Sequence, residues 1–308
     1  MSDIPATLQA RSRRLRIAVA IATSGRPDVV HEAIGLLPMQ TREPDGILVC
    51  APSQSDVCRL HPDYPAIQCF IGPRGLTYQR NRLLEAAGDF DVLVFLDDDF
   101  IMFPEYLAET EAVFAERHDV VLTTGSVVAD GIIGPGLTFH DARERVANSG
   151  KSQDPTKAVS GVSRVYNGYG CNMAVRLATV RAHAVRFDEE LPLYAWLEDV
   201  DFSRSIAPFG QIVRLEAARG VHLGIKTGRQ SGIRLGYSQI ANPCYLIAKG
   251  TCSWGRGLFN MSKNFAANIW GALRREKTVD RAGRLRGNLK AISDLIALRL
   301  APSRALHL

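Results

Sequence analysis

The sequence predicts an α/β protein with a mostly parallel central sheet, followed by a region made of helices only. Between residues 17 and 124, short apolar runs alternate with segments of helical spacing, which is typical of βαβ units. The apolar runs are continuous, which indicates strands that are covered on both faces. After about Lys226 only helical spacing remains, so the second part of the prediction starts there.

The individual elements follow from the same patterns. The first strand is expected at 17–22, where an apolar run ends in Thr-Ser-Gly-Arg-Pro at 23–27 and a helical pattern begins. Further strands are expected at 46–50, 67–71, 91–96 and 120–124, and helices at 76–87 and 106–117. Residues 131–170 are polar and rich in glycine, which predicts a loop region with short strands. We divide the chain into a tail (1–13), an α/β domain (14–230) and a basic amphipathic helical region (231–308).

The composition is that of an ordinary globular protein, with 46% hydrophobic and 22% charged residues, which excludes a disordered chain. The net charge of +5 hides an asymmetry. Residues 203–308 carry 18 basic and 4 acidic side chains, a balance of +14, whereas residues 1–202 have a balance of −9. The basic part fits either a solvated face or an anionic partner such as ligand phosphates, a nucleic acid or a membrane leaflet.

No apolar run approaches the length of about 18 residues that a bilayer-spanning helix needs. The run at 17–22 is also too short for the core of a signal peptide. The six cysteines include no C-x-x-C pair, so we expect free thiols in a reducing cytoplasm.

Three adjacent carboxylates, Asp97, Asp98 and Asp99, follow the fourth predicted strand. Like charges this close repel one another, and a divalent cation such as Mn²⁺ or Mg²⁺ would relieve the repulsion. Side chains alternate along an extended chain, so Asp97 and Asp99 are expected on one side and Asp98 on the other. A solvated acidic loop or a helix N-cap is the alternative interpretation.

A second acidic pair, Glu198 and Asp199, opens a predicted helix. The helix dipole stabilises carboxylates in a first turn, which would explain the pair without any function. The functional interpretation is a general base that faces the same cleft as the aspartate triplet.

Seven short motifs occur in one order along the chain, at 23–27, 75–81, 95–99, 170–174, 187–189, 197–202 and 220–222. In this order they resemble glycosyltransferase family 2, whose members are inverting, nucleotide-sugar-dependent enzymes with the GT-A fold. The resemblance covers residues 14–225. It implies a three-layer α/β/α sandwich with a nucleotide-sugar half at about 14–100 and an acceptor half at about 101–230.

For the donor, the resemblance implies that Asp97 contacts the ribose, that Asp99 binds the metal bridging the diphosphate, and that Asp98 supports this contact. The metal would be Mn²⁺ or Mg²⁺, which stabilises the departing nucleoside diphosphate. His222 matches a histidine of the family that completes the metal shell or touches the phosphates.

The remaining donor contacts concern the base. Thr23 and Arg26 fall where the family cradles base and ribose, and Arg80 falls where it contacts base or phosphate. In this family the second strand usually ends in an aspartate that reads the pyrimidine, but here Ala51 stands at that point and the next carboxylate is Asp56. A UDP-sugar is the first expectation, and a thymidine or other nucleotide is the alternative.

On the acceptor side, the resemblance implies that Asp199 deprotonates the acceptor hydroxyl and that Glu198 positions the acceptor or the base. The hydroxyl would attack the anomeric carbon from the face opposite the phosphate, so the configuration would invert. Gly170, Cys171 and Asn172 match a turn beside the acceptor, although a tight structural turn explains them equally simply.

In the helical region, aromatic side chains interleave with Lys and Arg. One predicted helical face carries Leu258, Met261, Phe265, Ile269 and Leu273. The pattern suits an interfacial helix on anionic lipid, but helices packed on the α/β domain would produce the same stripe. Nucleic acid is not expected as a partner, because the region holds no recognisable module for it.

Together these features predict a glycosyltransferase of bacterial polysaccharide biosynthesis that uses a saccharide or lipid-linked saccharide acceptor. We expect it to be cytoplasmic and peripheral on the inner face of the cell membrane. A nucleotide-sugar nucleotidyltransferase is the nearest rival, but its Gly-rich, basic phosphate loop would not fit into residues 23–27. A non-catalytic sugar- or membrane-binding module is the other rival, and the intact Asp99 and Asp199 disfavour it.

Overall fold

The structure is a computed structural model that describes residues 14–60, 67–132, 134–149, 161–226, 231–276 and 278–308. Its strands are β1 (Ile17–Ala22), β2 (Gly46–Ala51), β3 (Ile67–Ile71), β4 (Val92–Asp97), β5 (Phe100–Met102), β6 (Val120–Asp130), β7 (Val162–Arg164), β8 (Asn172–Arg176) and β9 (Gln211–His222). Its α-helices are α1 (Pro27–Gly35), α3 (Leu76–Ala86), α4 (Tyr106–Glu116), α5 (Phe139–Ser149), α6 (Leu177–Ala182), α7 (Glu198–Ile206), α8 (Gly232–Lys249), α9 (Trp254–Leu273) and α10 (Arg281–Ile296).

One sheet joins these strands in the order β3-β2-β1-β4-β8-β6-β9-β5, and β7 pairs with β9. β3, β2, β1 and β4 are parallel neighbours. Antiparallel β8 separates them from β6 and β9, which run parallel to each other. The expected strands and the mostly parallel sheet are therefore confirmed.

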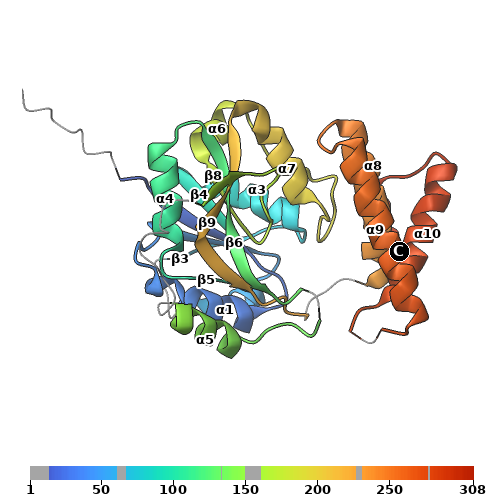
Figure 1. The fold of residues 1–308 in the computed structure, drawn as a ribbon, viewed down its shortest axis with the longest axis horizontal. Helices are drawn as coiled ribbons and strands as arrows, with labels where there is room; N and C mark the ends of the chain where they lie inside the picture. The colour runs from blue at the N-terminus through green and yellow to red at the C-terminus, as the bar shows by residue number, and fades with distance from the viewer. Residues whose placement is uncertain (1–13, 61–66, 133, 150–160, 227–230, 277) are drawn as a thin grey trace, which may run out of the picture.

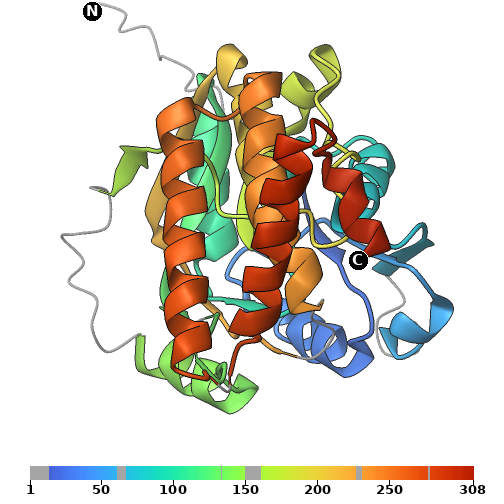
Figure 2. The same cartoon turned by 90° about the vertical axis from the view of Figure 1, so that its right-hand side faces the viewer.

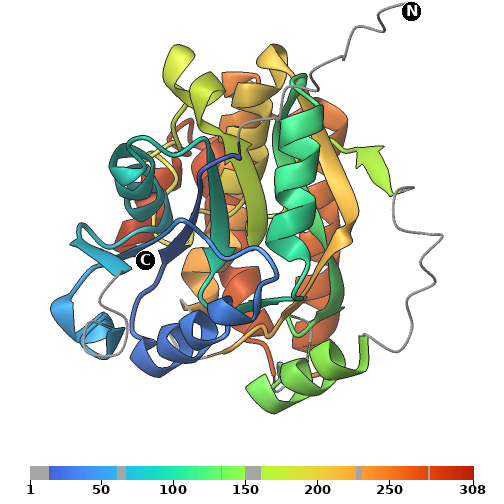
Figure 3. The ribbon, with the colours of Figure 1, turned by 90° about the vertical axis from the view of Figure 1, so that its left-hand side faces the viewer.

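Helices cover both faces of the sheet (Figure 1). Ile17, Val19 and Ile21 of β1 share a core with residues of α1 and α4, which lie on the side that Figure 3 shows. Ala18 and Ala20 of the same strand face a second core that α3, α6 and α7 complete. Because β1 is buried on both faces, its sequence is a continuous apolar run rather than an alternating one.

The expectation of loops with short strands at 131–170 is wrong in one respect, because α5 forms there. Thr138 and Asp141 cap its first turn reciprocally: the Asp141 carboxylate accepts the Thr138 N–H at 2.8 Å, and the Thr138 hydroxyl accepts the Asp141 N–H at 3.1 Å. Buried Ala142 packs with Val221 and Leu223 of the β9 segment. The short strand β7 does occur, and residues 150–160 lie outside the described residues.

The helical region stands beside the α/β domain as a bundle of α8, α9 and α10 (Figures 1 and 2). α8 and α10 touch at Gly236 and Gly287, where a Cβ on either residue would fall on the backbone of the other helix. Among the described residues, no helix combines the length and apolar character needed to cross a membrane. The predicted tail (1–13) and the predicted boundary at 230 lie outside the described residues, so the domain division stays a prediction.

Candidate active site

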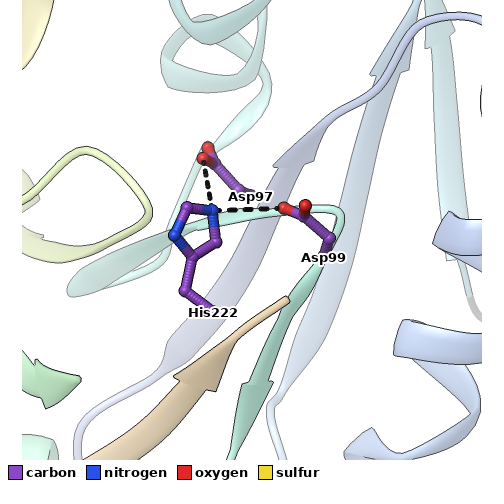
Figure 4. Close-up of side chains that lie close together, drawn as sticks. All are labelled: Asp97, Asp99 and His222. Carbon is purple, nitrogen blue, oxygen red and sulfur yellow. Dashed lines mark ion pairs between the residues drawn. The ribbon is translucent and has the colours of Figure 1, made fainter. Parts of the chain in front are cut away.

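The ends of β4 and β9 bring three potential metal ligands together. Nε2 of His222 lies 3.5 Å from Oδ1 of Asp99 and 4.0 Å from Oδ2 of Asp97 (Figure 4). The pairing of β5 with β9 sets Phe100 opposite His222, which places the histidine beside the turn that carries Asp99. The other oxygen of Asp99 accepts the N–H of Ile225 at 2.8 Å, and this bond orients the carboxylate.

A second carboxylate orients the imidazole ring. Nδ1 of His222 lies 2.9 Å from Oδ1 of Asp130, a contact that fixes the ring and directs Nε2 towards the two aspartates. Burial disfavours the charged ring, but the hydrogen bonds and charges of Asp130 and Asp99 outweigh burial and raise the pKa of His222 to about 10. Carboxylate and imidazole donors together suit Mn²⁺, and the carboxylates also suit Mg²⁺. The group formed by Asp97, Asp99 and His222 therefore fits a divalent cation.

Asp98 points away from this group, as the alternation of side chains predicts. Its fully buried carboxylate accepts the Thr23 hydroxyl at 2.6 Å and pairs with Nη2 of Arg26 at 2.6 Å. Burial raises the pKa of Asp98, and the charge of Arg26 opposes that shift. These three side chains connect the loop after β1 to the turn after β4. Their contact with a donor stays a prediction.

Asp56 joins the same loop, although the sequence places it five residues beyond Ala51. Its buried carboxylate accepts the N–H of Gly25 at 2.7 Å and the hydroxyl of Ser53 at 2.8 Å. The 3-10 turn Gln54–Asp56 brings the carboxylate back to the β1 loop. A carboxylate is thus present near the expected place, and the strand pattern alone does not predict it.

Arg80 connects the metal-ligand group to the second acidic motif. Its guanidinium is buried and donates from Nη1 to Oε1 of Glu198 at 2.6 Å. Nη2 donates to the carbonyl of Gly170 at 2.6 Å and to Oδ1 of Asp97 at 3.2 Å. The rigid, planar fork of arginine suits several acceptors at once. Because these partners are protein groups, the predicted contact of Arg80 with base or phosphate stays a prediction.

The predicted acidic pair opens α7 beside this arginine. Oδ2 of Asp199 accepts the N–H of Gly170 at 3.1 Å. Burial raises the pKa of Asp199, while the N–H groups of Gly170 and Val200 act in the opposite direction. A raised pKa brings a carboxylate nearer to the range in which a general base works at neutral pH. Oε2 of Glu198 is buried and has no hydrogen-bond partner within the described part of the chain, so it is an available acceptor.

The helical bundle holds the loop that leads into α7. In that loop, φ is positive at Leu193, Ala195 and Leu197. Such conformations are costly for non-glycine residues and persist only where the surroundings impose them.

Nδ2 of Asn242 on α8 donates to the carbonyl of Trp196 at 2.8 Å. Lys249 at the end of α8 pairs with Asp201 of α7 at 2.8 Å and with Asp188 at 2.6 Å. α8 therefore fixes the approach to the acidic pair, a role that sequence periodicity does not predict.

The predicted acceptor-side turn is tightly packed. A Cβ on Gly170 would lie 2.9 Å from the Glu198 carboxylate, so any other residue there would have to displace that carboxylate. Cys171 and Asn172 are buried, and the Asn172 amide bonds with the Thr124 hydroxyl at 2.7 Å and the Gly125 carbonyl at 3.2 Å. These contacts favour the structural interpretation for Asn172. A role of the turn in acceptor binding stays a prediction.

Comparisons with known proteins identify the fold. No protein-family profile matches the chain, and no curated protein matches its sequence. S. aureus TarS 1–349 in complex with UDP-GlcNAc matches with a TM-score of 0.56 at 14% identity, covering 94% of this chain and 83% of that chain. The mannosyltransferase PcManGT from Pyrobaculum calidifontis, in complex with GDP-Man and Mn²⁺, matches with a TM-score of 0.53 at 14% identity, covering 95% and 85%.

GalNAc-T7 with UDP, GalNAc and Mn²⁺ matches with a TM-score of 0.57 at 13% identity, covering 96% of this chain and 56% of that chain. A further TarS 1–349 structure, with a TM-score of 0.51, is matched over 66% of its length, so the chain spans just under two thirds of it. Likeness at these identities concerns the fold. The predicted GT-A fold is confirmed: the chain has the α/β architecture that it shares with the mannosyltransferase PcManGT.

Proposed function

We propose that this protein is a metal-dependent, inverting glycosyltransferase that moves a sugar from a nucleoside-diphosphate sugar to an acceptor hydroxyl. One observation carries the proposal: the metal-ligand group and the second acidic motif meet at one edge of the sheet. Arg80 bonds to both Asp97 and Glu198, so the two motifs are held together through a single buried side chain. A cation site beside a candidate base is the arrangement that such a transfer needs.

Each residue of the site then has a chemical task. Asp97, Asp99 and His222 would hold a divalent cation, which stabilises the charge that gathers on the departing diphosphate. Asp199 takes the proton of the acceptor hydroxyl, and the N–H of Gly170 fixes the carboxylate for this step.

Other side chains place the reactants. Oε2 of Glu198, which has no hydrogen-bond partner among the described residues, accepts a hydrogen bond from the acceptor. Thr23, Arg26 and Asp56 shape the loop that receives base and ribose. Attack from the side opposite the diphosphate inverts the anomeric centre.

The donor is a nucleotide sugar, with a UDP-sugar in first place. Support comes from the ligands in the similar structures: UDP-GlcNAc for TarS, UDP for GalNAc-T7 and GDP-Man for PcManGT. We further propose membership of glycosyltransferase family 2, a saccharide or lipid-linked saccharide acceptor, and a role in bacterial polysaccharide biosynthesis. The location that fits this role is the inner face of the cell membrane, with the +14 balance of residues 203–308 directed at anionic lipid.

A panel of UDP-, GDP- and dTDP-sugars tests the proposal through thermal unfolding with and without Mn²⁺. At saturating concentration, one donor class is expected to raise the Tm by about 5 °C when Mn²⁺ is present. Asp99→Ala should lose this shift. The control Asp119→Ala, which removes an exposed carboxylate just before β6, should keep it. If no nucleotide sugar stabilises the wild type, the proposed function is wrong.

A further inference from the structure

Helix α9 differs from an ordinary packed amphipathic helix in the side chains that it exposes. Its large apolar side chains face solvent: Phe259 is 67% exposed, Trp270 58% and Leu273 74%. The positions that α9 buries against the bundle are Gly257, Asn268 and Gly271. An amphipathic helix normally turns its apolar stripe towards its neighbours. Of the stripe predicted from the sequence, Leu258 and Leu273 are exposed, whereas Met261 packs against the apolar core of the bundle.

Where α9 meets α8 and α10, the interior of the bundle is polar and small, whereas α8 and α10 share an apolar core that includes Tyr237, Ile240 and Ala291. Nδ2 of Asn268 donates to Gln239 of α8 at 2.8 Å and to Asn288 of α10 at 2.8 Å. Nδ2 of Asn288 donates in turn to the carbonyl of Gly236 at 2.6 Å, next to the close contact with Gly287. Glycine contacts and amide hydrogen bonds between helices are what helices use where their outer surface meets lipid.

The charges around this surface are positive. α9 contains no acidic residue. Each of the three acidic residues of 231–308 has a partner within this region: Glu276 bonds to Arg281, Asp280 caps α10, and buried Asp294 pairs with Arg299 and Arg304. Arg256, Lys263, Arg274 and Arg275 are exposed on α9 or directly after it. A second copy of the same face would bring like charges together, whereas an anionic surface complements them.

We propose that α9 lies in the interface of an anionic lipid bilayer and inserts its exposed side chains Trp254, Leu258, Phe259, Trp270 and Leu273, here called the α9 face. Tryptophan near both ends of the helix matches the preference of indole for the headgroup level. The surrounding lysines and arginines attract anionic headgroups, at about 1 kcal/mol each. Figure 2 shows α9 at the left edge of the bundle, in front of the sheet. The inference deepens the proposed membrane location and is independent of sugar transfer.

Vesicle flotation of the full chain tests this inference. At low salt, the protein is expected to float with vesicles of equal parts phosphatidylglycerol and phosphatidylcholine, and not with pure phosphatidylcholine. The double variant Phe259→Ser, Trp270→Ser should partition at least about tenfold more weakly, because the interface loses two large apolar side chains. Both side chains are exposed, so the fold should tolerate the change. Met39→Ser, at a 54% exposed apolar position of the α/β domain, is the matched control and should float like the wild type.

Three outcomes would overturn the inference: no flotation with anionic vesicles, equal flotation with both lipids, or flotation that the double variant leaves unchanged. Sedimentation analysis adds a further arm. A wild-type dimer that the double variant dissociates, without lipid binding, would assign the α9 face to a second copy and likewise reject the bilayer. Donor binding measured on the same samples separates this inference from the proposed function. A wild-type protein that does not float with anionic vesicles but keeps Mn²⁺-dependent donor binding would contradict the α9 face and leave the proposed sugar transfer intact.

Discussion

The α/β domain and helix α9 of the bundle place the same residue types differently. The domain buries large apolar side chains on both faces of the sheet and gathers its carboxylates at the strand ends. Helix α9 buries glycine and asparagine and exposes tryptophan and leucine, although α8 and α10 share an apolar core beside it. Their charges differ in the same sense, with −9 for residues 1–202 and +14 for residues 203–308. We attribute the difference to the cation proposed for the one part and to the anionic lipid surface proposed for the other.

The two regions nevertheless meet at one place. α8 contacts the loop before α7 through Asn242 and contacts α7 itself through Lys249. Leu246 and Cys252 from the bundle share a small core with Leu191 and Ala195. The surface that we assign to lipid is therefore attached, through a few buried contacts, to the segment that carries Asp199.

The largest expected effect concerns the cation site of the α/β domain. Asp99→Ala should lower the rate of sugar transfer about a thousandfold or more, because the charge on the departing diphosphate loses its stabilisation. Calorimetric titration with UDP should show that Mn²⁺-dependent binding is lost as well. Unchanged Mn²⁺-dependent binding and unchanged transfer would show that Asp99 does not bind the cation.

The next largest effect separates the base from the cation site. Asp199→Asn should lower the transfer rate by about 10² to 10⁴, because the proton of the acceptor hydroxyl has no base to go to. Donor affinity should change by less than about twofold, since we assign Asp199 to the acceptor and not to the donor. Steady-state kinetics with both substrates measures the two effects. A variant that loses donor binding but keeps the rate constant would reverse the assigned roles.

Arg80→Ala tests the link between the two acidic motifs. Removing the buried guanidinium leaves the Glu198 and Asp97 carboxylates without their counter-charge, which should lower the free energy of unfolding by about 3 to 5 kcal/mol. The control is Arg82→Ala on the same helix, whose exposed side chain pairs only loosely with Glu85 at 3.7 Å, and it should cost less than about 1 kcal/mol. Urea unfolding of both variants decides the point. Equal losses of unfolding free energy in the two variants would show that Arg80 does not stabilise the site more than an exposed arginine does.

Gly287→Val tests the close contact between α8 and α10 in the bundle. The added side chain would fall on the backbone carbonyl of Ile233 in α8, and a backbone atom cannot move aside cheaply. We expect a loss of about 1 to 3 kcal/mol in thermal or urea unfolding. Gly255→Ala is the matched control, because its Cβ would meet no atom within 4 Å. That control should be neutral or slightly stabilising, by up to about 1 kcal/mol. Similar losses for both would contradict the close helix contact.

The smallest effect is a pH dependence within the bundle. Asp294 is buried, but hydrogen bonds from Arg304, Arg299 and Tyr237 outweigh burial and lower its pKa. A carboxyl whose pKa is lower in the folded state contributes stability above its unfolded pKa of about 3.9, and this contribution is lost as the pH falls through the folded value. Unfolding followed from about pH 5 down to about pH 2 should therefore show a shallower acid destabilisation for Asp294→Asn than for the wild type. Parallel curves would reject this role.

Local patterns predicted much of the fold and part of the site. The continuous apolar runs identified β1 and β4, and side-chain alternation placed Asp97 and Asp99 together and Asp98 apart. The helix α5 was not predicted, because the glycines before it masked the Thr138–Asp141 cap. The position of Asp56 beside the loop after β1 depends on a short 3-10 turn, which strand spacing does not reveal.

Other features depend on contacts between distant parts of the chain. Arg80 contacts Glu198, which lies 118 residues further along the chain, and Asn242 contacts Trp196, which lies 46 residues before it. No local sequence pattern predicts either contact. Periodicity also located an apolar stripe on α9 without saying which side the neighbouring helices would cover. That side was decided by Gly257, Asn268 and Gly271, which are the residues that fit against the bundle.

Binding of Mn²⁺ measured by electron paramagnetic resonance tests the central claim most directly, because it observes the cation itself. When UDP is present, the signal of free Mn²⁺ should fall on addition of the wild-type protein and of Asp119→Ala. It should stay unchanged on addition of Asp99→Ala or His222→Ala. Equal loss of the free signal with all four proteins, or with none of them, would contradict a nucleotide-binding cation site at Asp97, Asp99 and His222.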